Sequence, residues 1–113
     1  MSDIIPLGRL PEEIRGEALR GLLLVIRRLA RACNAERWTI TNTVRIIGGY
    51  EVTVYFRLDP RVDVENAIKR FNGVEDYMGD KVHIRIANIS TVYADLGLLK
   101  AVLNVYLYGQ RWR

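Results

Sequence analysis

The stretch from Arg37 to Leu58 constrains the fold most, because its side chains alternate on either side of the glycine pair Gly48-Gly49. It is rich in β-branched and aromatic residues, and this pattern is typical of a β-hairpin. A two-residue Gly-Gly loop would mix polar and apolar residues on both faces, so we reject that register. A three-residue loop, 47–49, gives one apolar face with these pairs: Ile46 with Tyr50, Val44 with Val52, Ile40 with Phe56, and Trp38 with Leu58.

The other face of this hairpin is polar. In the same register its pairs are Arg45 with Glu51, Thr43 with Thr53, Thr41 with Tyr55, and Thr39 with Arg57. Trp38 and Phe56 are therefore predicted to lie in the core. Asn42 is the one polar residue expected on the apolar side, where it needs a hydrogen-bond partner.

Two helices are predicted. Apolar residues recur at helical spacing from Pro11 to about Asn34, and the opposite arc of this helix carries Arg20, Leu24, Arg27, Arg28 and Arg31. This basic stripe is interpreted as a solvated helix face, because charge on an exposed helix needs no partner. The second helix follows Asp63, a residue type favoured at the N-cap, and ends at Asn72-Gly73.

Two more strands complete the predicted fold, one from Lys81 to about Ile89 and one from Ala101 to Tyr108. Residues 75–80 are predicted to form a turn and residues 93–98 a loop. The order helix, hairpin, helix, hairpin (αββαββ) predicts one α+β domain over residues 1–113, with a four-stranded antiparallel sheet and helices packed on one face. Residues 1–10 and 109–113 are expected to be peripheral, and the strand order stays open.

Length and composition exclude several classes of protein. The 113 residues suffice for one domain, and the longest apolar run, Leu22 to Ile26, is far shorter than the roughly 20 residues of a membrane helix. We therefore expect a soluble, cytoplasmic protein. One cysteine, Cys33, and one histidine, His83, exclude an internal disulfide and a zinc site made of such ligands, so no metal or cofactor is predicted.

The charge balance favours anionic partners. The chain has 17 Lys plus Arg against 13 Asp plus Glu, and 14 of the 17 are arginine, whose planar fork can bind phosphate bidentately. One cysteine, one glutamine and many charged residues also fit a thermophilic source.

The polar face of the predicted sheet is the candidate site. Cations beside hydroxyls and tyrosines suit a single-stranded nucleic acid, because bases stack on rings while Arg and Lys neutralise phosphates. The alternative is an ordinary solvent-facing sheet, since Thr and Tyr favour strands anyway. The tail adds Trp112 as a clamp, unless it is simply frayed. The candidate residues are Arg37, Thr39, Thr41, Thr43, Arg45, Tyr55, Arg57, Lys81, His83, Arg85, Tyr106, Tyr108 and Trp112.

An enzyme is not predicted. His83 has no nucleophile and carboxylate identifiable beside it, and Cys33 is expected to be buried and inert. The acids Glu75, Asp76 and Asp80 lack the spacing of a calcium loop and are interpreted as loop charges.

The pattern as a whole resembles the ThermoDBP-related single-stranded DNA-binding proteins of hyperthermophilic archaea. The resemblance covers about residues 11–108 and rests on the Arg-rich first helix, the hairpin Arg37-Trp38-Thr39 to Tyr55-Phe56-Arg57, and the second helix and hairpin. It implies sequence-independent binding of single strands, without a cofactor, by basic and aromatic residues in a cleft. The best-known members dimerise through a C-terminal zipper, and this sequence has no heptads before Arg113, so a homodimer remains open.

A second hypothesis is a module for protein interaction or oligomerisation. An exposed sheet edge, Leu24 or the Tyr106/Tyr108 patch would dock a partner or a second copy. The excess of cations on the polar face argues against this second hypothesis, because a protein interface does not require that excess. The sequence leaves DNA and RNA undistinguished.

Overall fold

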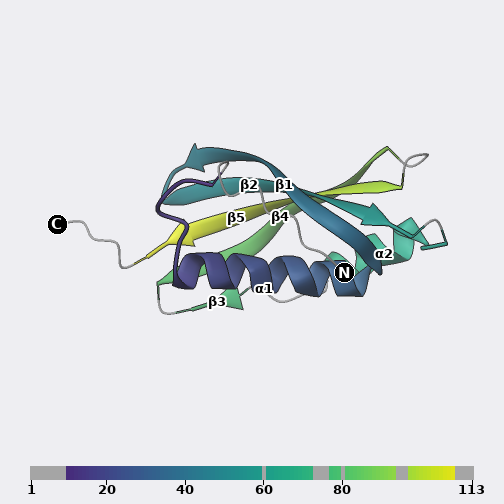
Figure 1. The fold of residues 1–113 in the computed structure, drawn as a ribbon, viewed down its shortest axis with the longest axis horizontal. Coiled ribbons are helices and arrows are strands. Elements are labelled where there is room, and N and C mark those ends of the chain that lie inside the picture. Colours follow the sequence, from purple (N-terminus) through teal and green to yellow (C-terminus); the bar gives the residue numbers. More distant parts are fainter. Residues whose placement is uncertain (1–9, 60, 73–76, 80, 94–96, 109–113) are drawn as a thin grey trace.

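The computed structural model of the protein describes residues 10–59, 61–72, 77–79, 81–93 and 97–108. Five strands form one antiparallel sheet in the order β1-β2-β5-β4-β3, and the two helices pack on one face of it (Figure 1). Along the chain the elements are α1 (Glu17–Ala32), β1 (Ala35–Ile46), β2 (Gly49–Leu58), α2 (Val64–Asn72), β3 (Tyr77–Met78), β4 (Val82–Tyr93) and β5 (Leu98–Leu107).

The four-stranded αββαββ prediction is wrong, because the sheet has a fifth strand at its edge. Tyr77 and Met78, expected in a turn, pair with Ile84 and His83 of β4. A strand of two residues is too short to show an alternating pattern. The strand order also places β5 between β2 and β4, so the last strand of the chain joins the two halves of the sheet.

Helix α1 begins later than predicted, at Glu17 in place of Pro11. Gly16 has a φ of 53°, a left-handed conformation that interrupts a helix, and the residues before it form turns. The helix ends at Ala32, and Asn34 takes a left-handed φ of 56° in the turn to β1. Its two faces are as predicted: Leu22, Ile26 and Leu29 are buried, and Arg20, Leu24, Arg27, Arg28 and Arg31 are exposed.

Gly21 explains how β3 reaches the helix. A Cβ at Gly21 would lie 2.8 Å or less from ring carbons of Tyr77, so only glycine leaves room for this ring. The Tyr77 hydroxyl donates a hydrogen bond to Glu17 Oε2 at 3.2 Å. The ring of Tyr77 therefore packs along the first turns of α1.

The predicted register of the first hairpin is wrong. Its loop is Ile47-Gly48, with Gly48 at a φ of 83°, and β1 and β2 pair from Ile46 with Gly49 onward. A β-bulge then lies between Ile40 and Asn42. One extra residue in a strand moves every residue beyond it to the opposite face.

The bulge divides β1 into two parts, and the alternation of side chains between the two faces of the sheet is shifted by one residue from one part to the other. Before the bulge, Trp38 and Phe56 are both buried in the core, as predicted, although Trp38 pairs with Phe56 and not with Leu58. Beyond it, Thr43 and Arg45 pair with the buried Val52 and Tyr50, so they lie on the helix side. Asn42 and Val44 pair with Thr53 and Glu51 on the opposite face. Asn42 is accordingly exposed, in contrast to its predicted burial, and Val44 is 46% exposed.

Candidate functional site

The face of the sheet that the helices leave uncovered is called the outer face here (Figure 1). Its residues follow from the pairing of the five strands. They are Arg37, Thr39, Asn42, Val44 and Ile46 of β1, Glu51, Thr53, Tyr55 and Arg57 of β2, Leu98, Lys100, Val102, Asn104 and Tyr106 of β5, His83, Arg85, Asn88 and Ser90 of β4, and Met78 of β3.

Most of the predicted site residues reach this face. Arg37, Thr39, Tyr55, Arg57, His83, Arg85 and Tyr106 lie on it, and Lys81 and Tyr108 adjoin its end, where the Tyr108 N–H donates to the Lys81 carbonyl. Thr41 occupies the bulge. Thr43 and Arg45 are on the helix side, so their predicted place on the polar face of the sheet is wrong. Trp112 lies outside the described residues.

Sequence reasoning missed Lys100. It pairs with Tyr55 on β2 and with Ser90 on β4, near the centre of the outer face. The alternation Leu98, Lys100, Val102, Asn104 was the available signal. The predicted strand begins at Ala101, three residues after the first residue of β5, so Lys100 is left out of it.

One end of the outer face forms an arginine pocket, defined as Arg37, Thr39, Tyr55, Arg57 and Leu98, an open pocket also lined by Trp38. Thr39 pairs with Tyr55, and Arg37 pairs with Arg57. The two arginines are therefore direct neighbours on adjacent strands, and both are exposed. Like charges placed directly opposite each other repel. The pocket thus concentrates positive charge beside a half-buried tyrosine ring.

The other end forms a tyrosine cluster around His83. The His83 ring centroid lies 6.2 Å from that of Tyr106 and 6.3 Å from that of Tyr108, and the second pair is stacked with an interplanar angle of 27°. The guanidinium of Arg85 lies over the Tyr106 ring at 5.7 Å. Asn104 Nδ2 donates to the Tyr106 hydroxyl at 3.3 Å. These contacts hold several ring faces at the solvent boundary.

The two ends are joined by β5. Lys100, opposite Tyr55, and Tyr106 are six residues apart on this strand, a separation of about 20 Å at the usual rise of a β-strand. Between these two ends of the outer face, β1 and β4 each contain a bulge. The bulges lie at the same position along the strands, because one row of paired residues runs across the sheet next to both of them. This row is Asn42, Thr53, Val102 and Asn88. Bulges bend and twist a sheet locally. The outer face is thereby divided into two halves.

Arg45 has a different partner on the helix side. Its guanidinium carbon lies 5.2 Å from the centroid of the Tyr50 ring. Glu13 completes the group: its own backbone hydrogen bond and a hydrogen bond with Tyr50 lower the pKa of its carboxyl, and Arg45 adds to this effect. Burial raises the pKa of Tyr50, and Glu13 raises it further. Tyr50 therefore connects the hairpin to the segment before α1, and Arg45 lies beside this contact.

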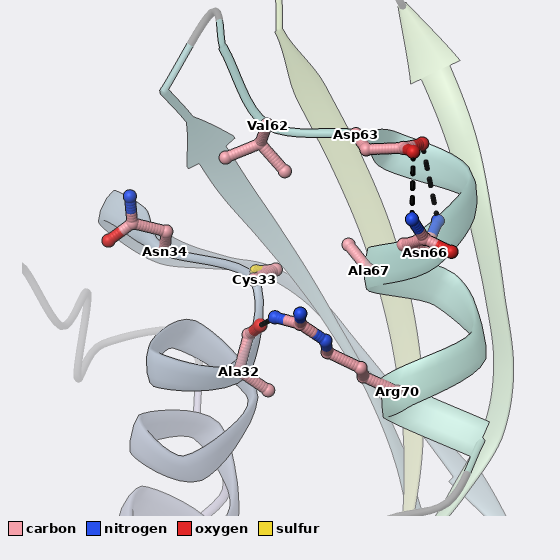
Figure 2. Close-up of a pocket in the computed structure, with 8 residues that line it drawn as sticks. All are labelled: Ala32, Cys33, Asn34, Val62, Asp63, Asn66, Ala67 and Arg70. Atoms are coloured by element: carbon pink, nitrogen blue, oxygen red, sulfur yellow. Dashed lines mark hydrogen bonds between the residues drawn. The ribbon is translucent and has the colours of Figure 1, made fainter.

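A second pocket lies where the end of α1 meets α2 (Figure 2). Asp63 caps α2: its Oδ1 accepts from the Glu65 N–H at 3.1 Å, and its Oδ2 accepts from Asn66 Nδ2 at 2.8 Å. Arg70 donates to the Ala32 carbonyl at 3.2 Å. Cys33 is 2% exposed, and burial raises the pKa of its thiol to about 12. These groups stabilise the packing of the end of α1 against α2. Cys33 is buried, as predicted.

Comparisons of the chain with protein-family models, with curated proteins and with solved structures found no match. The resemblance to ThermoDBP-related proteins therefore stays a prediction. In the part of the chain that the structure describes, neither helix has the length and apolar character needed to cross a membrane.

Proposed function

We propose that the protein binds single-stranded nucleic acid, with single-stranded DNA as the favoured ligand, across the outer face of its sheet. The observation that carries this proposal is the direct pairing of Arg37 with Arg57 beside the half-buried ring of Tyr55. Paired arginines repel each other when nothing lies between them. A bound phosphate removes that repulsion, because each guanidinium can bind it through charge-assisted hydrogen bonds.

Charge over the rest of the face supports the same ligand. Among the paired residues of the described strands, the outer face carries the cations Arg37, Arg57, Arg85 and Lys100 and a single acid, Glu51. Lys81 adds a cation at the end of the face. A positive surface with interleaved rings suits a flexible strand whose phosphates and bases alternate.

The two ends of the face have complementary roles in this proposal. Tyr55 in the arginine pocket stacks on one base, and the tyrosine cluster of His83, Tyr106 and Tyr108 stacks on others. The strand follows β5 between them, where Lys100 contacts its backbone. Ring faces and phosphate contacts do not distinguish bases, so we expect little sequence preference.

The experiment that tests this proposal is a band-shift series with fluorescent oligonucleotides. The protein is titrated against single-stranded DNA, single-stranded RNA and duplex DNA of equal length at low salt. We expect retention of single strands in preference to duplex, because bases in a duplex are already stacked. No shift of either single strand at low salt would exclude this function.

A second candidate function is self-association, which the register of β1 favours. Beyond the bulge, Val44 and Ile46 lie on the outer face of an edge strand, and Ile47 at the hairpin loop is 96% exposed. Exposed apolar residues on an unpaired edge are a ready surface for another copy. Light scattering at increasing protein concentration tests this candidate. An Ile47→Asp variant should shift a dimer toward monomer, and a wild-type protein that stays monomeric contradicts it.

A further inference from the structure

We infer that the exposed arginine stripe of α1 is a second phosphate-binding surface, so that one molecule bridges two strands of nucleic acid. The stripe is defined as Arg20, Arg27, Arg28 and Arg31, and it spans twelve residues, or about 16 Å of helix axis. The bridging activity rests on the proposed function of the outer face. It adds a second site on the opposite side of the molecule.

The composition of the stripe is the first argument. All four arginines are exposed, and α1 has no acidic residue after Glu17. Glu17 pairs with Arg20 at 3.9 Å in the first turns. For Arg28 and Arg31, no ion pair with a described residue is found. Arg28 and Arg31, in the last two turns of the helix, therefore present positive charge that no acid of the described residues pairs with.

Repulsion between neighbouring arginines distinguishes this stripe from an ordinary solvated helix face. Arg28 and Arg31 are three residues apart, so their side chains are neighbours on the helix surface. Like charges at this spacing destabilise a helix, whereas an acid in place of one of them would stabilise it. A partner with regularly spaced negative charges offsets this cost. The phosphate backbone of a nucleic acid is such a partner, and arginine binds phosphate bidentately.

The position of the stripe is the second argument. Helix α1 packs on the inner face of the sheet through Leu22, Ile26 and Leu29, so its exposed side points away from the outer face (Figure 1). The thickness of the sheet and of the helix separates the two surfaces. A short strand that lies along β5 cannot reach the arginines of α1. The stripe therefore binds a second strand, or a distant part of a long one.

Two triple variants test bridging, and each removes three cations. The helix variant is Arg27→Gln, Arg28→Gln and Arg31→Gln, and the sheet variant is Arg37→Gln, Arg57→Gln and Lys100→Gln. Glutamine has nearly the same helix propensity as arginine. Two non-complementary single strands, one with a donor and one with an acceptor fluorophore, report bridging by energy transfer when protein is added. Circular dichroism and light scattering verify the fold and the oligomeric state of each variant.

We expect the wild-type protein to produce energy transfer and the helix variant to lose it while still binding one strand. In the wild type, the salt slope of bridging should exceed that of single-strand binding by about 2, since each of the three arginine contacts adds about 0.7. The sheet variant should lose binding of the first strand. Binding of one strand without energy transfer in wild-type protein would overturn the bridging inference and leave the proposed function standing.

Two further outcomes would also contradict the inference. If the helix variant transfers energy as well as the wild type, or if transfer requires a dimer, the stripe is not the second site. If the wild type instead sediments with vesicles containing anionic phospholipid and the helix variant does not, while neither bridges strands, the exposed Leu24 and the arginines serve a membrane surface. Loss of all binding in wild-type protein would exclude the proposed function itself.

Discussion

The guanidinium of Arg45 lies over the ring of Tyr50, its direct partner across the first hairpin, on the side of the sheet that faces the helices. The sequence pattern placed this arginine in the nucleic-acid site. In the structure its neighbours are Tyr50 and Glu13, which belong to the packing at the end of the hairpin. Arg45 and Arg57, two arginines of one hairpin, therefore lie on opposite faces of the sheet.

Substitution Arg45→Ala should lower stability and leave binding unchanged. Loss of a cation–π contact costs roughly 0.5–1 kcal/mol, because the ring quadrupole no longer attracts a charge. Urea denaturation and oligonucleotide binding measure the two effects. Arg57→Ala is the matched control and should do the reverse: binding weakens, and stability stays the same or rises as the repulsion with Arg37 is removed. Equal losses of binding in both variants would contradict the register.

Substitution Tyr55→Ala should weaken binding of a single strand by roughly 1–3 kcal/mol, the range for losing one stacked base. The salt dependence should not change, because no phosphate contact is removed. Tyr55 is only half-buried, and Tyr55→Phe, which keeps the ring, should bind as the wild type does. Fluorescence anisotropy at two salt concentrations measures both quantities. A large loss of thermal stability with unchanged binding would show that the ring has a structural role.

Substitution Gly21→Ala should destabilise the fold although alanine is the better helix former. The gain in propensity is about 1 kcal/mol, but the new methyl group collides with Tyr77, and overpacking of this kind costs roughly 1–3 kcal/mol. In a Tyr77→Ala background the same change should be much less costly. A double-mutant cycle by urea denaturation measures this coupling. Independent effects of the two substitutions would contradict the contact between α1 and β3.

Cys33 should be unreactive in the native protein and should make stability depend on alkaline pH. Burial raises the pKa of its thiol from 9.0 to about 12, so the unfolded state loses the proton first. The stabilising contribution is full below pH 9 and declines as pH rises from 9 toward 12. The loss between pH 8 and 10.5 should be about 1–2 kcal/mol larger for the wild type than for Cys33→Ala. Rapid alkylation of native protein at pH 8 would contradict the burial.

The sequence was sufficient to predict elements whose periodicity is long and regular. The two faces of α1, the cap at Asp63, and the core positions of Trp38 and Phe56 all follow from local patterns, and the structure confirms them. The inward and outward alternation of Lys81 to Ile86 is also confirmed. In these segments each residue type favours the environment that the fold provides.

The wrong predictions arise where a single residue interrupts the alternation of a strand, or where a strand is too short to show one. The bulge at Thr41 is invisible in composition, yet it moves Thr43 and Arg45 to the helix side and exposes Val44. Strand β3 has two residues, and its Tyr77 packs against Gly21, which lies 56 residues earlier in the chain. Register and strand order decide that Arg37 pairs with Arg57 and that His83 lies beside Tyr108. A pattern within one segment of the sequence predicts neither the register nor the strand order.

The most direct test of the proposed site is the salt dependence of single-strand binding in Arg57→Ala beside Arg15→Ala. Both variants lose one exposed arginine, but Arg15 precedes α1, pairs with Glu12 at 3.4 Å and does not line the arginine pocket. The slope of log affinity against log salt should decrease in magnitude by about 0.7 in Arg57→Ala and remain at the wild-type value in Arg15→Ala. Identical slopes in the wild type and both variants would show that the strand does not contact the arginine pocket, and the outer face would not be the binding site.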